Sequence, residues 1–291
     1  YAIENSGDYI KELYSSSLEA AQTLDSGIVN YLYGTHGSVL NIKNLIPTIT
    51  LTLGISAIPV LSRAWTAKNK ADIKATIESV LRVTMIIALP AGFGIAALSK
   101  PILTLLYPGE AHMIPIAAPM LTVYGFGIFL FAIVSPVTNM LQAVGRTDIP
   151  LRTVFIGSVV KIALNFFLIA NPKINIHGAP ISTTVCYIIM ITLNLSSLIK
   201  VTGVKIDFVS VFVKPCISGA ACGVAAFGAN YLLQNILGMR NSVSTIISIC
   251  AGAGIYAIFM LLLKGIAKSD IEMLPKGEKI AKVLEKFKVL G

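Results

Sequence analysis

The sequence predicts an all-α protein, a polytopic bundle of about seven transmembrane helices. Apolar residues make up 55% of its 291 residues, charged residues only 13%, and the mean hydropathy is +0.79. A soluble domain carries charges on roughly a quarter of its residues. Because a helix needs ~20 apolar residues to cross a bilayer, the long apolar stretches of this chain indicate repeated membrane crossing.

The predicted spans follow one another with short polar connections. They are expected at residues 38–62, 78–99, 113–142, 151–171, 178–199, 208–233 and 243–263. The chain then divides into a polar segment on the outer face (1–37), a lobe of five spans (38–200), two terminal spanning helices (201–265) and a basic cytoplasmic tail (266–291).

Prolines interrupt the first three predicted spans, at Pro47, Pro59, Pro90, Pro115, Pro119 and Pro136. A proline removes a backbone donor, but neighbouring helices and water can bond the freed carbonyl inside a membrane protein. The sequence LPAGFG around Pro90 predicts a kink in the second span. Such a kink suits a helix that bends during transport, and it suits a static packing role equally well.

Basic residues are divided unequally between the two ends of the predicted spans. Of the 23 lysines and arginines, fifteen lie in the segments after spans one, three, five and seven, four lie on the opposite side, and four lie within spans. Cytoplasmic loops of membrane proteins are enriched in lysine and arginine. We therefore expect the N-terminus of this chain outside the membrane and the C-terminus in the cytoplasm.

The spans lack the residue patterns of a membrane-embedded enzyme. No Asp or Glu lies at a span centre, no metal-binding His–Glu cluster or phosphate-binding P-loop is present, and the four cysteines lie inside apolar runs. We therefore expect no enzymatic activity and neither cofactor nor metal. The net charge of +9 is interpreted as a topology signal rather than as a sign of nucleic-acid binding.

Lys161 is the first candidate for function because it lies near the middle of a predicted span. A lysine at that depth costs about 2.5–3.5 kcal/mol on insertion scales, and it is tolerated where it faces a wet cavity or a partner. Asn165 follows one helical turn later, on the same face. The alternative interpretation is a lysine at a helix packing seam, held by backbone carbonyls.

Other polar side chains inside the spans extend this candidate set: Lys43, Asn44, Asn139, Gln142 and Asn194. Lysine is a compact point charge suited to phosphate, and amides suit sugar hydroxyls. The set favours an anionic, sugar-bearing substrate over a cationic drug. Each amide could equally form an interhelical hydrogen bond worth ~0.6 kcal/mol.

Two basic segments have amphipathic periodicity. The first places Ile73, Ile77, Val80 and Leu81 on one stripe, and the tail has a second stripe within residues 280–287. Apolar stripes opposite lysines are typical of helices that lie in an anionic leaflet. We therefore expect contacts with anionic membrane lipids, with a solvated helix as an equal alternative for the tail.

Short sequences along the chain carry a family resemblance. They are Leu32-Tyr33-Gly34, Leu45-Ile46-Pro47, Ile58-Pro59-Val60-Leu61-Ser62, Ala88-Leu89-Pro90-Ala91-Gly92, Leu141-Gln142-Ala143-Val144-Gly145-Arg146 with Pro150, Lys161 with Asn165, and Ile176-His177-Gly178-Ala179-Pro180-Ile181-Ser182-Thr183. In this order and spacing, over about residues 30–265, the sequence resembles the stage V sporulation protein B type of polysaccharide flippase. That superfamily also holds lipid II flippases and multidrug exporters.

The resemblance implies a two-lobe flippase of the bacterial plasma membrane. This chain, which begins at Tyr1, would hold the second lobe without its first helix, plus two terminal helices, and the N-terminal lobe would be its partner. The implied activity is translocation of a lipid-linked saccharide precursor for cell-wall or polysaccharide synthesis. Lys161 and Lys43 would contact phosphate, and the amides Asn165, Gln142 and Asn139 would contact polar head groups.

Other functions stay open from the sequence. An ion-coupled multidrug exporter of the same superfamily generally uses a membrane carboxylate, and no span centre of this chain contains one. A seven-helix receptor or a non-transporting scaffold for a synthase would share the gross layout. A lysine in the fourth span without a counter-ion carboxylate argues against the receptor.

Overall fold

The computed structural model describes residues 28–171 and 173–265, and within them all regular structure is helical. The α-helices are α3 (Ile28–Thr66), α4 (Lys70–Ala97), α5 (Ser99–Leu106), α6 (Ile114–Ala143), α7 (Asp148–Ala170), α8 (Gly178–Thr202), α9 (Lys214–Tyr231) and α10 (Asn241–Leu262). Short π-helical turns, η3 (Val209–Val213) and η4 (Leu232–Ile236), flank α9. Most of the predicted outer-face segment, and the predicted basic tail with its stripe at 280–287, lie outside the described residues.

Seven helical segments of the described ranges are long and apolar enough to cross a membrane, which confirms the predicted all-α, multi-pass class. The first two helices are longer than predicted. α3 begins at Ile28 rather than near residue 38, and α4 begins at Lys70 rather than near residue 78. Polar side chains lower the hydropathy of both helix starts, so a hydropathy criterion finds only their apolar parts.

The predicted interfacial helix at the start of α4 is wrong. Ile73, Ile77, Val80 and Leu81 are each at most 4% exposed and belong to the protein core. Their stripe therefore packs against other helices of the chain and does not lie in lipid. Asn69 begins α4 instead, because its side chain accepts hydrogen bonds from the first backbone N–H groups of the helix.

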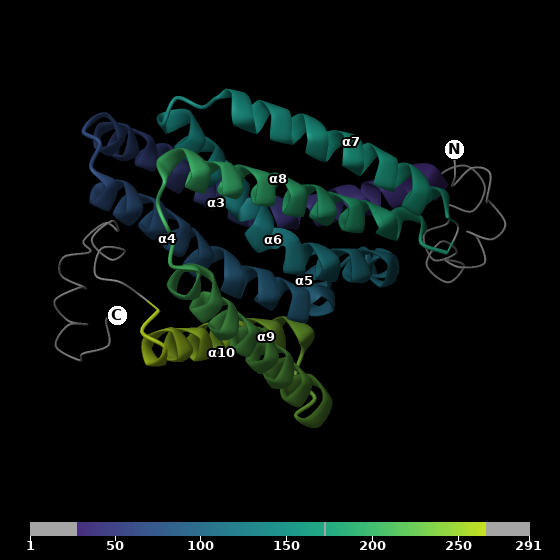
Figure 1. Ribbon diagram of the computed structural model, residues 1–291. Helices are drawn as coiled ribbons and strands as arrows, with labels where there is room; N and C mark the ends of the chain where they lie inside the picture. The colour runs from purple at the N-terminus through teal and green to yellow at the C-terminus, as the bar shows by residue number, and fades with distance from the viewer. Residues whose placement is uncertain (1–27, 172, 266–291) are drawn as a thin grey trace.

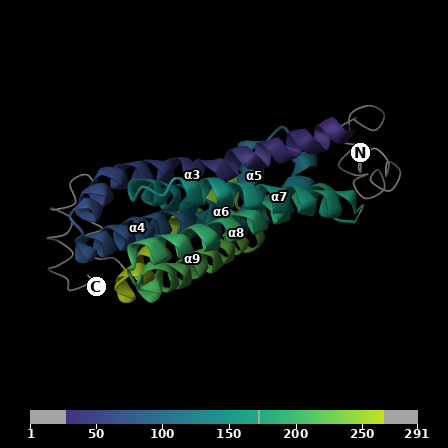
Figure 2. The same ribbon diagram turned by 45° about the horizontal axis from the view of Figure 1, so that its top comes forward.

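α6 lies at the centre of the bundle, where it contacts α3, α4 and α8. α7 packs chiefly on α8, and the α9–α10 pair packs chiefly on α4 and α5. Figure 1 shows α7 at one edge of the bundle and the α9–α10 pair at the opposite edge. α3 begins and α10 ends at opposite ends of the bundle (Figures 1 and 2), as an odd number of crossings requires.

Two apolar clusters fill the two ends of the bundle. One includes Ala57 of α3 and Ile133 of α6, together with residues near the ends of α3, α6 and α8 and the start of α4. The other includes Ile42 of α3 and Tyr124 of α6, together with residues of α5. The stretch of α3 between residues 42 and 57 therefore lies between the two clusters.

Two of the prolines inside helices have their freed carbonyls bonded by a hydroxyl of a neighbouring helix. Pro90 cannot donate to the carbonyl of Ile86, and the Tyr256 hydroxyl of α10 donates to that oxygen at 3.0 Å. Pro136 likewise frees the carbonyl of Ala132, to which Thr50 of α3 donates at 3.1 Å. These bonds are the interhelical compensation expected from the sequence, and they join α4 to α10 and α6 to α3.

α4 and α6 approach closely because Gly125 has no side chain. A Cβ atom added there would lie 2.6 Å from the backbone nitrogen of Ala96. Small residues at such crossings let two backbones pack directly, which favours association of helices inside a membrane. This contact helps to hold α6 in its central position.

Candidate functional site

Lys43 is buried inside the bundle, and its ammonium group lies against aromatic rings. The side chain belongs to α3, and the residue is only 6% exposed. Its Nζ atom lies 4.4 Å from the ring centroid of Phe131, 5.1 Å from that of Tyr124 and 5.6 Å from that of Tyr187. We call these three rings, two on α6 and one on α8, the aromatic cage. A desolvated cation over aromatic faces gains about 2 kcal/mol or more.

His36 extends this group along α3. Its Nε2 atom lies 2.9 Å from the Tyr124 hydroxyl oxygen, so the two groups share a hydrogen bond. The sequence prediction missed His36 and all three rings of the cage. A signal was present, because His36 and Lys43 are seven residues apart, as are the two cage residues on α6. That spacing places both members of each pair on one helix face.

Lys161 approaches the group from α7 and is half-buried. It lies close enough to Lys43 and His36 to act on both electrostatically, and it also acts on Cys186 of α8. α7 rests on α8 through Gly157, where an added Cβ would lie 3.0 Å from the sulfur of Cys186. The structure thus brings the two predicted phosphate-binding lysines into one neighbourhood.

The charges of this neighbourhood are unbalanced. Among the described residues, neither Lys43 nor Lys161 forms an ion pair with a carboxylate. Like charges repel strongly where water is scarce, and an anion beside them would interact favourably with both. The arrangement can therefore hold a multiply charged oxyanion such as a phosphate, with Lys161 as the more accessible cation.

Asn165 lies one turn beyond Lys161 on α7, and its Oδ1 atom accepts a hydrogen bond from the Ser182 hydroxyl of α8. This is the interhelical hydrogen bond that the sequence left open as an alternative. The bond uses the carbonyl oxygen of the amide. A contact between its NH₂ group and a substrate stays a prediction.

Asn139 and Gln142 lie farther along α6, eight and eleven residues beyond Phe131. At 1.5 Å per residue these offsets correspond to about 12 Å and about 16 Å along the helix. Asn139 faces Gly54 of α3, and its buried amide nitrogen has no hydrogen-bond partner among the described residues. Gln142 is exposed in the last turn of α6. The structure therefore separates both amides from the aromatic cage, and their contact with a head group stays a prediction.

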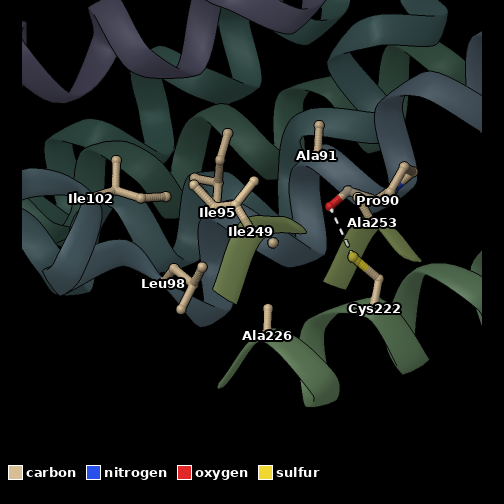
Figure 3. Close-up of a pocket in the computed structure, with 10 residues that line it drawn as sticks. Pro90, Ala91, Ile95, Leu98, Ile102, Cys222, Ala226, Ile249 and Ala253 are labelled. Carbon is tan, nitrogen blue, oxygen red and sulfur yellow. Dashed lines mark hydrogen bonds between the residues drawn. The ribbon is translucent and has the colours of Figure 1, made fainter. Parts of the chain in front are cut away.

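A separate apolar hollow of about 250 Å³ lies between α4, α9 and α10. Figure 3 shows Pro90 and Ile95 of α4 on one side, with Cys222 of α9 and Ile249 of α10 facing them. The Cys222 thiol lies 3.9 Å from the carbonyl oxygen of Pro90. No charged side chain of the described ranges lines this hollow, so its lining suits hydrocarbon. Across residues 28–171 and 173–265, no three metal-ligating side chains gather at one place.

Comparison with known proteins gives one family match and several similar proteins, two of them named as flippases. Residues 32–167 match the family described as MatE. Stage V sporulation protein B of Bacillus subtilis (strain 168) is 23% identical over 245 residues, which cover 82% of this chain and 45% of that protein. Lipid II flippase MurJ of the same strain is 26% identical over 141 residues, covering 48% of this chain and 26% of that protein. The chain therefore spans less than half the length of these relatives.

A solved structure shares the fold. Lipid II flippase MurJ in its inward closed conformation superposes with a TM-score of 0.62 at 20% identity, covering 88% of this chain and 52% of that one. The fold and its seven candidate spanning helices in the described ranges define a multi-pass membrane protein. These matches confirm the predicted resemblance to the flippase superfamily: part of the chain matches the MatE family, and the chain shares sequence similarity with stage V sporulation protein B and with MurJ.

Proposed function

We propose that this chain is part of a flippase that moves a lipid-linked saccharide precursor across the bacterial plasma membrane. The observation that carries the proposal is that Lys161, half-buried on α7, acts electrostatically on the buried Lys43, and that neither lysine has a carboxylate partner in the described ranges. Such a pair favours an anionic group, and the pyrophosphate of a lipid-linked sugar is an anion that enters a membrane. The similarity to proteins named as lipid II flippase MurJ supports this substrate class.

The two lysines have different roles in this proposal. Lys161 is half-buried and binds the pyrophosphate directly. Lys43, enclosed by the aromatic cage, adds a fixed positive charge behind it. Asn165, Gln142 and Asn139 serve the sugar or other head groups through their amides. An ion-coupled multidrug exporter is less well supported, because a cationic drug would be repelled by both lysines.

A companion lobe is the second part of the proposal. α3 exposes a polar stripe with residues spaced three or four apart: Asn41, Asn44, Thr48, Thr52 and Ser56. A helix that presents two amides and three hydroxyls to hydrocarbon is unfavourable, so this face suits a wet cavity or another protein unit. We expect the chain alone to self-associate in detergent. If the isolated chain is instead a stable monomer with lipid covering the exposed face of α3, the proposal of a companion lobe is contradicted.

The direct test of the site is Lys161→Ala in the transporting protein. We expect loss of flipping of a labelled lipid-linked saccharide into the outer leaflet, with expression and melting temperature unchanged. Lys161→Arg should recover only part of the activity, because a planar guanidinium hydrates and bonds differently from a point ammonium. Unchanged transport by the alanine variant would remove Lys161 from the site and support the packing-seam interpretation.

The proposed orientation places the end of α3 in the cytoplasm. It can be tested with single cysteines at Ala67 and Lys173, both of which are exposed, at opposite ends of the bundle. Asn175 is unsuitable for the outer position because it is only 1% exposed. An impermeant thiol reagent added to intact cells should label the cysteine at 173 and spare the one at 67. The reverse labelling would overturn the orientation.

A further inference from the structure

A second group of basic side chains surrounds an open hollow at one end of the bundle. The hollow has a volume of about 510 Å³ and lies where α3 ends, α4 begins and α8 ends. Lys68, Lys70 and Lys200 line it together with Trp65. We call it the basic hollow. It contains neither Lys43 nor Lys161, so it is independent of the proposed transport site.

The backbone around the basic hollow is held in place by helix-terminating turns. Lys68 adopts a left-handed conformation with φ of 53°, and the Asn69 side chain caps α4. On the other side, Gly203 adopts φ of 66° and ends α8. Both conformations stop one helix sharply. Three lysines from two segments far apart in the sequence, Lys68 with Lys70 and Lys200, are therefore carried on defined backbone.

The carboxylates of this region are bonded elsewhere. Asp72 accepts a hydrogen bond from the Asn69 amide at 2.7 Å, and Glu78 pairs with Lys74 at 3.7 Å. Among the residues that the structure describes, no acidic side chain lines the basic hollow. In the part of the chain that the structure describes, Lys68, Lys70 and Lys200 form no ion pair. The hollow is therefore a site of uncompensated positive charge.

Helix dipoles explain only part of this arrangement. Lys68 and Lys200 lie near the C-terminal ends of α3 and α8, where a cation is favourable. Lys70 is the first residue of α4, at the N-terminal end of its dipole, where a cation is unfavourable. Lys70 also lies beside the two other lysines, which repel it. Its charge becomes favourable when an anion occupies the hollow.

The position of the basic hollow indicates where its ligand comes from. The hollow lies at helix ends, which is the level of the membrane–water boundary. Trp65, the only tryptophan of the chain, is partly buried against the core there, as expected for an aromatic side chain at head-group depth. Ile73 and Val201 add apolar surface to the lining. Cationic groups above apolar surface match an amphiphile better than a small soluble ion.

We propose that the basic hollow binds the phosphate of an anionic phospholipid from the leaflet on that side of the membrane. The three ammonium groups bind the phosphate as point charges, and the glycerol and first acyl carbons lie along Trp65, Ile73 and Val201. The bound lipid neutralises the charge around the start of α4. It thereby fixes the junction of α3, α4 and α8 to the membrane surface.

Trp65 makes the proposal directly measurable. The 291-residue chain is reconstituted in phosphatidylcholine vesicles that contain equal mole fractions of either brominated phosphatidylglycerol or brominated phosphatidylcholine. We expect Trp65 fluorescence to be quenched more strongly by the brominated anionic lipid. Each lysine near a membrane surface changes the affinity for anionic lipid about fivefold, so Lys68→Gln, Lys70→Gln and Lys200→Gln combined should abolish the preference.

A matched control removes the same charge from the same end of the bundle. The control variant combines Arg152→Gln, Lys205→Gln and Lys264→Gln, at three exposed residues outside the hollow. It should keep the stronger quenching by the brominated anionic lipid. Equal loss in both variants would assign the effect to general surface charge and overturn the site. No preference in the unmodified chain would overturn it as well.

Two further measurements keep the result decisive. Millimolar inorganic phosphate should leave the quenching unchanged, and relief of quenching would instead assign the hollow to soluble phosphate. If the triple variant fails to fold, as judged by its circular dichroism, Lys70→Gln replaces it. That change removes a cation from the positive end of a helix, so the fold should hold while the preference falls about fivefold.

Discussion

Lys43 and Lys161 carry the same charge inside spanning helices, but the chain surrounds them differently. Lys43 is 6% exposed and lies over three aromatic rings. Lys161 is half-buried on α7, a helix on the edge of the bundle whose spanning part is mostly exposed. Burying an ion costs several kcal/mol of desolvation free energy. A few cation–π contacts stabilise the ion by an amount of the same order. The cage thus makes Lys43 tolerable without a ligand, whereas Lys161 depends on hydration or a bound anion.

The largest effect on this comparison should come from removing a ring of the cage. Tyr124→Ala removes a side chain that is 2% exposed, together with the hydroxyl that bonds His36. Deleting a buried aromatic side chain costs about 3–5 kcal/mol, so we expect a clear fall in the melting temperature in detergent. Phe167→Ala, at a residue of α7 that is 71% exposed, is the control and should change stability by less than about 0.5 kcal/mol. Similar values for both variants would show that the cage does not stabilise the fold.

An intermediate effect should follow from removing the caged charge itself. Lys43→Met keeps much of the side-chain volume, and replacing a buried ion by an apolar group is often neutral or stabilising by about 1–4 kcal/mol. We expect an equal or higher melting temperature together with reduced transport. Lys161→Met should reduce transport with little change in melting temperature, because that side chain is only half-buried. A lower melting temperature for Lys43→Met would mean that the cation–π contacts of the cage stabilise the fold by more than the desolvation of the Lys43 charge destabilises it.

The smallest effect should come from single hydroxyl groups. Tyr124→Phe keeps the ring under Lys43 and removes only the hydroxyl, which bonds His36 and Thr183, with an expected cost of about 0.5–1.5 kcal/mol. Tyr256→Phe removes the bond to the Ile86 carbonyl that Pro90 leaves free, far from the cage, with an expected cost of about 0.6 kcal/mol. Thermal melting of both variants separates the contribution of ring and hydroxyl. A Tyr124→Phe cost as large as that of Tyr124→Ala would assign the stability of the cage to the hydrogen bond.

The sequence by itself determined the number and approximate position of the spanning helices. α7, predicted at residues 151–171, is observed at Asp148–Ala170. This agreement has a simple cause. A helix that crosses hydrocarbon must satisfy its backbone hydrogen bonds internally, and it needs ~20 apolar residues to span the hydrocarbon. Both requirements are local, so they are visible in composition alone.

Tertiary structure decided what each polar or amphipathic position contacts. The stripe of Ile73 and Ile77 has the same spacing whether it covers lipid or a protein core, and only the packing of α4 showed that it covers the core. Lys43 and Lys161 are separated by more than a hundred residues, and no local pattern indicates that they meet. Their proximity follows from the packing of α3 on α6, α6 on α8 and α8 on α7. Side-chain partners across helices are set by these crossings, and hydropathy carries no information about them.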